Sequence, residues 1–495
     1  MPDRSHSKTA SRLFARMNAE GIRYCHWKSN SHLDAALTGS TDLDLLVDQG
    51  QVAEFRRVCA EEGFKLLPTH SSRAYPEADN IFSVDESTGT LLHLDVHYRL
   101  IIGQRHFKEY RPPWADEILA RRVLADEYGV YTSDAESELL LLIVRLALKI
   151  RARDLPRILT RAGGPGGNQR VEFDWLMERT EPARVAELGK QLLSPDALDL
   201  LEQTMSDDLS YRSLLRLRGR LRRDLRSWQA GHRLAGTFRR WRREAWWAIG
   251  GLNRRYLHRP IPYSRGGSAG GLVVAVVGTQ GAGKSTITGA LNAWLAPKTD
   301  VLPIYFGSGD GPSSLVRWPL TVAKTMYLRR RGTSQTDAPP SRSPNPRGGV
   351  RALWGLALAW EKRSKLRRMV KGRSRGFIVI CDRYPQSQVR GLNDGPLLTS
   401  WAQSGSSWRR RLAAWELGVY EDAARLGPDI FVRLLLTSEA ALERRPGHDP
   451  VELEYRNDIV RQAYSSARRM VIDIDAEQEL EPLVLDLKRR LWPEI

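Results

Sequence analysis

The chain has 495 residues, a net charge of +18, 41% hydrophobic residues and 27% charged residues. This length is too great for one ordinary domain, and the composition is that of a globular protein rather than a disordered or fibrous one. The three cysteines show neither zinc-ligand spacing nor a disulfide framework, and residues 1–17 lack the apolar core of a secretion signal. No apolar run reaches the ~20 residues that span a bilayer, so we expect a cytoplasmic protein.

The N-terminal part of the chain, residues 1–150, predicts a domain that mixes helices and strands. Residues 8–22 carry apolar side chains at helical spacing, and residues 43–47 and 91–98 are typical of strands. Residues 134–151 begin with acids and end with bases, around an apolar run that Arg145 interrupts. This pattern suits the helix dipole and predicts a buried helix.

Three acids of this part lie on its predicted strands. Asp42 and Asp44 alternate along one strand, so both face the same side of the sheet, and Asp95 lies on another strand. Three carboxylates on two neighbouring strands can hold two Mg²⁺ ions for attack on a nucleotide phosphate. In the alternative interpretation the same acids are solvated or paired with nearby bases.

A serine, an Asp-x-Asp pair and a third acid, in this order, resemble the nucleotidyltransferase superfamily over about residues 10–150. The serine is Ser29, and Lys28 stands where that superfamily has a glycine. The resemblance implies an α+β nucleotidyltransferase-like fold in which Asp42, Asp44 and Asp95 bind the metal. Lys28 could itself contact phosphate.

A helical, arginine-rich connector is predicted over residues 151–259. Between residues 206 and 270 the chain has sixteen arginines, no lysine and four acids. Leucines and tryptophans interleave with these arginines at three- and four-residue steps, which predicts amphipathic helices over residues 211–258. We rank a bridge between two domains first, contact with an anionic membrane second, and nucleic-acid binding last.

Residues 260–271 predict a linker rich in glycine and proline. From residue 272 to residue 495, apolar strand-like runs alternate with helical patterns. This alternation predicts an α/β domain with a parallel sheet and flanking helices.

A phosphate-binding loop follows the first strand of this C-terminal domain. The sequence fits G-x-x-x-x-G-K-[ST] in full, directly between a strand and a helix. Its glycines let backbone amides turn around a phosphate, Lys284 reaches the β- and γ-phosphates of ATP, and Ser285 ligates Mg²⁺. The predicted ATP-binding residues are Gly278, Thr279, Gln280, Gly281, Ala282, Gly283, Lys284, Ser285 and Thr286.

Two further motifs place charged residues beside this loop. The apolar run 377–381 ends in Asp382 and Arg383, at the carboxyl edge of the sheet, where an acid can hold Mg²⁺ and an arginine a phosphate. After the strand predicted at 427–436, Arg444 and Arg445 stand on a Pro-Gly segment that suits a lid over the transferring phosphate.

The order of these motifs over residues 271–495 resembles the thymidylate kinase family of P-loop kinases. The resemblance implies that Asp382 assists Mg²⁺, that Arg383 contacts the acceptor phosphate, and that Arg444 or Arg445 acts as the catalytic arginine. Residues 305–310 replace the stretch that helps that family to hold its nucleotide acceptor.

The sequence therefore predicts an ATP- and Mg²⁺-dependent phosphotransferase acting on dTMP or a related phosphorylated acceptor, fused to a nucleotidyltransferase-like module. Lys284, Arg383, Arg444 and Arg445 are its predicted catalytic residues. Two alternatives remain: a regulatory protein that binds ATP without transferring phosphate, and a nucleotidyltransferase that modifies nucleic acid.

Overall fold

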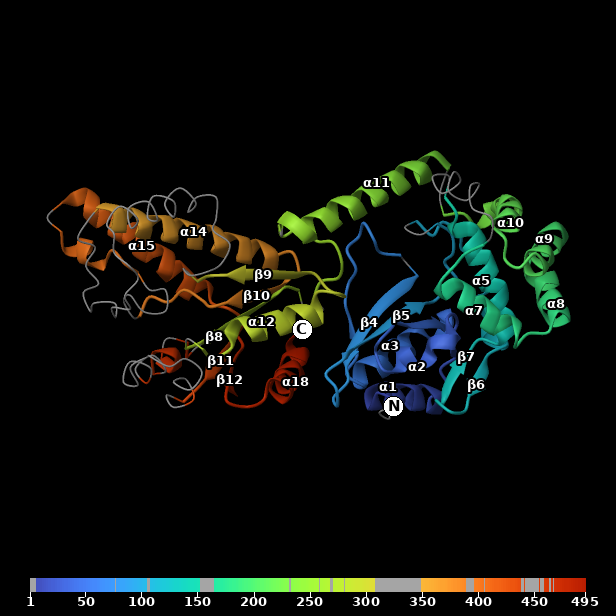
Figure 1. The fold of residues 1–495 in the computed structure, drawn as a ribbon, viewed down its shortest axis with the longest axis horizontal. Coiled ribbons are helices and arrows are strands. Elements are labelled where there is room, and N and C mark those ends of the chain that lie inside the picture. The colour runs from blue at the N-terminus through green and yellow to red at the C-terminus, as the bar shows by residue number, and fades with distance from the viewer. Residues whose placement is uncertain are drawn as a thin grey trace, which may run out of the picture. The chain divides into compact units, whose positions relative to one another are not determined.

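The computed structural model describes residues 6–495 with the exception of residues 76, 105–106, 152–163, 231–232, 258, 268–269, 280, 308–348, 389–395, 405, 438–439, 441–453, 455–457, 463 and 466. The chain forms two compact units, Met1–Leu252 and Asn253–Ile495. Each unit combines a β-sheet with packed helices, so the predicted α/β fold class is confirmed (Figure 1).

Seven described strands of the first unit form one sheet in the order β3-β4-β5-β2-β1-β7-β6. The pairs β2–β5 and β1–β7 are parallel, and the others are antiparallel. The strands are β1 Tyr24–His26, β2 Leu43–Val47, β3 Lys65–Leu66, β4 Ala78–Val84, β5 Leu91–His97, β6 Val123–Ala125 and β7 Val130–Thr132.

Helices pack on both sides of this sheet (Figure 1). Leucine and valine side chains of β2 and β5 join α1, α2 and α3 in one core, and α5 and α7–α10 form a second core on the other side. The helices of this unit are α1 Lys8–Ala19, α2 Leu33–Leu37, α3 Val52–Glu61, α4 Ala115–Ala120, α5 Ala135–Lys149, α7 Asn168–Met177, α8 Pro182–Leu192, α9 Pro195–Ser206, α10 Tyr211–Asp224 and α11 Arg233–Leu252.

Helix α5 is the buried helix that the sequence predicted. Asp134 caps it by accepting a hydrogen bond from the backbone N–H of Ser137 at 3.1 Å. Glu136 and Glu138 lie in its first turn and Lys149 in its last, which suits the helix dipole. Almost every side chain of α5 is buried, because both the sheet and the surrounding helices pack against it.

Helices α7–α10 belong to this same compact unit, although the sequence predicted a connector over this region. Leu214, Leu217 and Leu221 of α10 are fully buried against α5 and α9. The leucine stripe is therefore used inside the unit, and Arg212, Arg216, Arg222 and Arg223 of α10 are exposed. The finer domain boundaries stay a prediction.

In the second unit, five described strands form a fully parallel sheet in the order β12-β11-β8-β10-β9. The first strand, β8, lies in the middle, so every apolar residue of its continuous run is buried. The strands are β8 Leu272–Gly278, β9 Val301–Tyr305, β10 Ile378–Asp382, β11 Ile430–Leu435 and β12 Met470–Asp475.

Helices cover both faces of this parallel sheet (Figure 1). α12 Lys284–Leu295 and α18 Leu480–Leu491 lie on one face, and α14 Gly349–Arg373 and α15 Ser407–Leu426 lie on the other. Short helical turns accompany them at Asn253–Leu257, Thr399–Gln403 and Trp492–Glu494. Among the described helices of the chain, none is long and apolar enough to cross a membrane.

Asp429 ties the base of this sheet together. It is 1% exposed, accepts a hydrogen bond from the backbone N–H of Val273 at 2.8 Å, and pairs with Arg373 at 2.7 Å. One carboxylate thus links β8, the start of β11 and the end of α14. Removing it leaves both a backbone donor and a guanidinium without this acceptor.

We therefore expect Asp429→Ala to destabilise the second unit by about 3 kcal/mol. Amide hydrogen exchange in peptides that cover β8 and β11, followed by mass spectrometry, would then become about 100-fold faster. The matched control is Asp422→Ala, which breaks a solvent-exposed ion pair with Arg425 on α15 and should change exchange little. Equal exchange in the two variants would contradict the role of Asp429.

Candidate functional site

The predicted phosphate loop connects β8 to α12. Gly281 and Gly283 adopt left-handed backbone conformations, with φ of +90° and +81°. A Cβ at Gly278 would lie 2.8 Å from the carbonyl oxygen of Leu434, so only glycine fits there without a shift. The loop therefore presents the first amides of α12 and the positive end of its dipole to one point, which suits an anion. Gln280 lies outside the described residues.

Lys284 and Ser285 begin α12 directly after this turn. Lys284 is only 8% exposed, and its Nζ donates a hydrogen bond to the carbonyl oxygen of Thr279 at 2.5 Å. Its charge is thus held against the loop, where a bound phosphate would meet it. Thr286 follows on the exposed side of the helix.

Ser285 meets Asp382 across the edge of the sheet. β8 and β10 are parallel neighbours with Asp382 opposite Val276, and the Ser285 hydroxyl donates to Asp382 Oδ2 at 2.9 Å. Asp382 Oδ1 is buried, and no hydrogen-bond partner for it lies among the described residues. A hydroxyl and a carboxylate with an unused oxygen form the hard oxygen donor set that Mg²⁺ prefers.

Arg383 turns the chain away at the end of β10. Its φ is +67°, which is unusual for a residue other than glycine, and its backbone N–H still bonds the carbonyl oxygen of Val276 at 3.0 Å. Backbone strain of this kind clusters at functional sites. Arg444 and Arg445 lie outside the described residues, so their predicted roles and that of Arg383 stay predictions.

A cavity of about 620 Å³ adjoins Ser285 and Asp382. It lies between α12, β9, β10 and α14, and it combines aromatic rings with charged groups. The side chains that matter most for its chemistry are those of Tyr305, Trp360, Glu361, Lys365 and Arg368, besides Ser285 and Asp382.

Besides Asp382 of β10, the charged groups that line this cavity come from one face of α14. Lys365 pairs with Glu361 at 2.6 Å and lies 5.8 Å from the ring centre of Tyr305. Burial lowers the pKa of Arg368. Our sequence analysis missed these residues, although their spacing at positions 361, 364, 365 and 368 places them on one helical face. This spacing is the sequence pattern from which the charged face of α14 could have been predicted.

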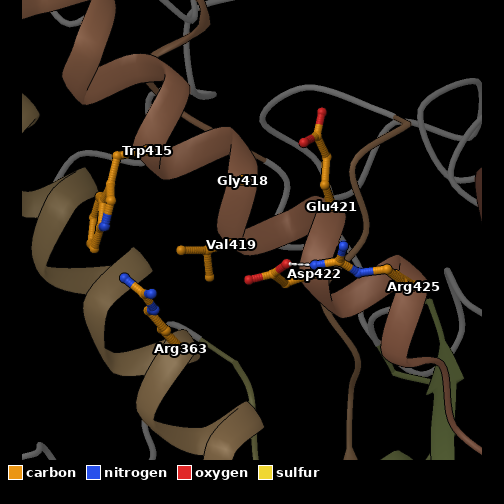
Figure 2. Close-up of a pocket in the computed structure, with 7 residues that line it drawn as sticks. All are labelled: Arg363, Trp415, Gly418, Val419, Glu421, Asp422 and Arg425. Atoms are coloured by element: carbon orange, nitrogen blue, oxygen red, sulfur yellow. Dashed lines mark hydrogen bonds and ion pairs between the residues drawn. The ribbon is translucent and has the colours of Figure 1, made fainter.

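A second cavity, of about 320 Å³, lies between α14 and α15 (Figure 2). Arg363 and Trp415 face each other across it, and Asp422 and Arg425 of α15 form an ion pair at its side. None of its lining residues comes from the sheet or the phosphate loop. It therefore supplies no group to the site around Ser285 and Asp382.

In the first unit, the three acids that the sequence singled out lie on β5, on β2 and just before β2. Asp44 lies opposite Asp95 in the parallel β2–β5 pair. Each acid is engaged by a base: Asp42 by His93 at 2.9 Å, Asp44 by Lys28 at 2.6 Å and Asp95 by His97 at 3.6 Å.

These pairs correspond to the alternative interpretation of the acids. Although burial opposes it, the neighbouring His97 holds the pKa of Asp95 well below its usual range. Within the described part of the chain, no group of three or more His, Cys, Asp or Glu side chains is arranged to hold a metal ion. The metal-binding role of Asp42, Asp44 and Asp95 stays a prediction.

Helix α11 carries part of the arginine-rich segment, and one of its sides packs on the segment 70–75. Trp246 stacks on His70 with ring centres 5.4 Å apart. Arg243 donates a hydrogen bond to the carbonyl oxygen of Ala74 at 2.7 Å, and the Arg73 guanidinium lies 3.7 Å from the ring centre of Trp247. These contacts fix the orientation of α11 on the first unit.

Another side of α11 exposes large apolar side chains. Trp241, Ile249 and Leu252 are 66%, 55% and 56% exposed, and their spacing puts them on one helical face. Exposed Arg242 lies beside them. An apolar stripe flanked by arginines is the pattern of a helix that lies in a membrane interface, so contact with anionic lipid stays our prediction for this segment.

We expect the protein to float with anionic vesicles at low salt, because each arginine near such a surface contributes ~1 kcal/mol. High salt should release it. The double variant Trp241→Ala/Leu252→Ala should reduce flotation several-fold, whereas Trp408→Ala, which removes an exposed tryptophan of α15, should not. Equal recovery with anionic and neutral vesicles, or none with either, would contradict the lipid contact.

Comparison with known proteins relates the chain to two proteins of Escherichia coli strain K12. Uncharacterized ATP-binding protein YghS is 31% identical over 206 residues, which make up 41% of this chain and 85% of YghS. Uncharacterized ATP-binding protein YghR is 29% identical over 212 residues, 41% of this chain and 80% of YghR. No protein-family model matches the chain. Since it covers most of YghS at this identity, the chain belongs to the family of uncharacterized ATP-binding proteins that includes YghS.

Proposed function

We propose that the second unit is an ATP-dependent phosphotransferase that resembles thymidylate kinase and moves the γ-phosphate of ATP to dTMP or a related phosphorylated acceptor. One observation carries this proposal: the Ser285–Asp382 pair lies at the junction between the phosphate loop and a cavity lined by two cations and two aromatic rings. The proposed donor site and the proposed acceptor cavity would then share the Ser285–Asp382 pair.

The phosphate loop would hold the donor nucleotide. The amides that follow Gly278 would surround the β-phosphate, and Lys284 would leave the carbonyl of Thr279 to contact the β- and γ-phosphates. The names of YghS and YghR, both ATP-binding proteins, support ATP as the nucleotide.

Ser285 and Asp382 would hold a Mg²⁺ ion that arrives with ATP. Their oxygens fit such an ion, because Asp382 Oδ1 is a buried acceptor with no hydrogen-bond partner among the described residues. When bound, Mg²⁺ neutralises charge between the β- and γ-phosphates. The two side chains would orient the γ-phosphate toward the cavity.

The cavity would hold the acceptor. Lys365 and Arg368 are cations that can bind its phosphate, and the rings of Tyr305 and Trp360 offer flat surfaces for a base or sugar. Arg383 lies beside Asp382 and would contact the same phosphate. Glu361 keeps Lys365 in place through its 2.6 Å ion pair.

Two alternatives differ from this proposal in the reaction that the protein carries out with the nucleotide. A regulatory protein would bind ATP but transfer no phosphate to any monophosphate. A nucleotidyltransferase that modifies nucleic acid would use the first unit and bind DNA or RNA with a steep dependence on salt. Labelled ATP offered with a panel of nucleoside and sugar monophosphates separates the phosphotransferase from both alternatives, and binding of DNA or RNA at low and high salt separates the alternatives from each other.

Replacing Lys284 tests the donor site. We expect Lys284→Ala to lower the rate of ATP turnover by about 100-fold or more, because the ammonium stabilises charge in the transition state. The control is Lys371→Ala, which removes an exposed ammonium of α14 and should leave turnover unchanged. Full turnover by folded Lys284→Ala protein would refute the assignment.

Replacing the cavity cations tests the acceptor site. Lys365→Met and Arg368→Met should each lower kcat/KM for the acceptor by at least about 10-fold, since each loses a charged hydrogen bond to phosphate. The affinity for ATP should not change. Arg367→Met, on the exposed side of the same helix, is the control. A parallel loss of ATP affinity would instead assign these cations to the donor.

A further inference from the structure

Trp27 of the first unit is surrounded by basic groups from three separate segments. It follows β1 and is 2% exposed. The His97 ring centre lies 5.6 Å from the centre of its ring, the Lys28 ammonium 5.1 Å and the Arg145 guanidinium 5.3 Å. The loop after β1, strand β5 and helix α5 thus bring positive or protonatable groups to one indole.

Several of these groups carry hydrogen-bonding atoms that the protein does not use. Trp27 Nε1, Arg145 Nη1 and His97 Nδ1 are buried, and none has a hydrogen-bond partner among the residues that the structure describes, whereas His97 Nε2 faces Asp95 Oδ1 at 3.6 Å. Native proteins pair nearly all of their buried polar atoms. The indole N–H of Trp27 and the guanidinium of Arg145 are therefore two buried donors without a described partner, and they point to a ligand that accepts hydrogen bonds.

Two further cations, Lys108 and Lys149, lie near Lys28 and Arg145. Burial, together with the nearby charges of Arg145, Lys28 and Lys108, lowers the pKa of Lys149 to about 8. Lys108 is partly buried, desolvation lowers its pKa, and its φ is +42°. An anion would relieve the mutual repulsion of these cations.

The acids here are already engaged. Lys28 Nζ lies 2.6 Å from Asp44 Oδ1, where a divalent cation would need that oxygen, and His97 lies beside Asp95. Glu138 accepts two hydrogen bonds from Asn30, from its backbone N–H at 2.9 Å and its side-chain amide at 2.7 Å. These residues do not fit a two-metal centre.

We propose that the first unit binds a phosphate-bearing small molecule without a divalent metal, through Trp27, Lys28 and Arg145, with the His97 ring packed against Trp27. Phosphate suits this site better than a single carboxylate, because its several oxygens can accept from the guanidinium, the indole N–H and the ammonium together. The loop is pre-organised for this purpose by Glu138 and by Ser29, whose φ is +59°. The site is independent of the phosphotransfer proposed for the second unit.

Inorganic pyrophosphate is the probe, and isothermal titration calorimetry in EDTA is the measurement. The full-length protein carries Lys284→Ala, which weakens the phosphate loop of the second unit and leaves the first unit intact. We expect one equivalent of pyrophosphate to bind, with an affinity that Mg²⁺ does not raise. Succinate, which offers carboxylates at a similar spacing, should bind at least about 10-fold more weakly.

Two substitutions in the same background locate the site. Trp27→Phe keeps an aromatic ring but removes the indole N–H, and Arg145→Met removes the guanidinium. Each should weaken pyrophosphate binding at least about 10-fold, whereas Lys190→Met, at an exposed position of α8, should not. Hydrogen exchange in α5 and β5 verifies that the variants fold.

Four results would overturn the proposal. These are no binding of pyrophosphate in EDTA, binding that requires Mg²⁺, equal binding of succinate, and unchanged affinity in folded Trp27→Phe protein. Because Trp27→Phe is a conservative change, misfolding of Arg145→Met would still leave the indole N–H to decide the question. Failure here would not affect the donor and acceptor sites of the second unit.

Discussion

The register of β8 against β10 is the constraint on which the site of the second unit depends. Asp382 lies opposite Val276, near the end of the strand that leads into the phosphate loop. Because side chains alternate along a strand, a slip of one residue would turn Asp382 to the opposite face of the sheet. The observed register instead brings its Oδ2 to 2.9 Å from the hydroxyl of Ser285. The backbone of Arg383 extends the contact with Val276 and then turns away.

Helix α14 packs on this sheet and also lines the cavity beside Asp382. One of its faces buries Ala359, Leu366 and Met369 in the core above the sheet. The neighbouring face presents Lys365 and Arg368 to the cavity beside Asp382. A single helix therefore covers the sheet and supplies the charges for an acceptor, and its packing fixes where those charges lie.

The acids on the strands have different partners in the two units. In the second unit, Asp382 accepts from a neutral hydroxyl and keeps one buried oxygen without a hydrogen-bond partner among the described residues. In the first unit, Lys28 neutralises Asp44, and His97 adjoins Asp95. A carboxylate with an unused oxygen suits a divalent cation, whereas paired carboxylates surrounded by further cations suit an anion. The same residue type thus supports different chemistry according to its neighbours.

The sequence by itself determined the α/β class, the buried helix α5 and the position of the phosphate loop. These features depend on local patterns: an unbroken apolar run before Gly278, glycines that can adopt left-handed conformations, and acids and bases at the correct ends of a helix. It also predicted Asp382 at the carboxyl edge of the sheet, because an apolar run that ends in an acid is a pattern of neighbouring residues and can be recognised without the tertiary structure.

Only the tertiary structure decided which distant residues meet. Lys365 and Arg368 follow the phosphate loop by about eighty residues, and α14 brings them to its side because the helix packs across the parallel sheet. In the first unit, Lys28 reaches Asp44 because β1 pairs antiparallel with β2, and Arg145 reaches Trp27 because α5 packs on the same face. A sequence pattern records the chemical type of each side chain, but its partners depend on strand register and helix packing between segments far apart in the chain.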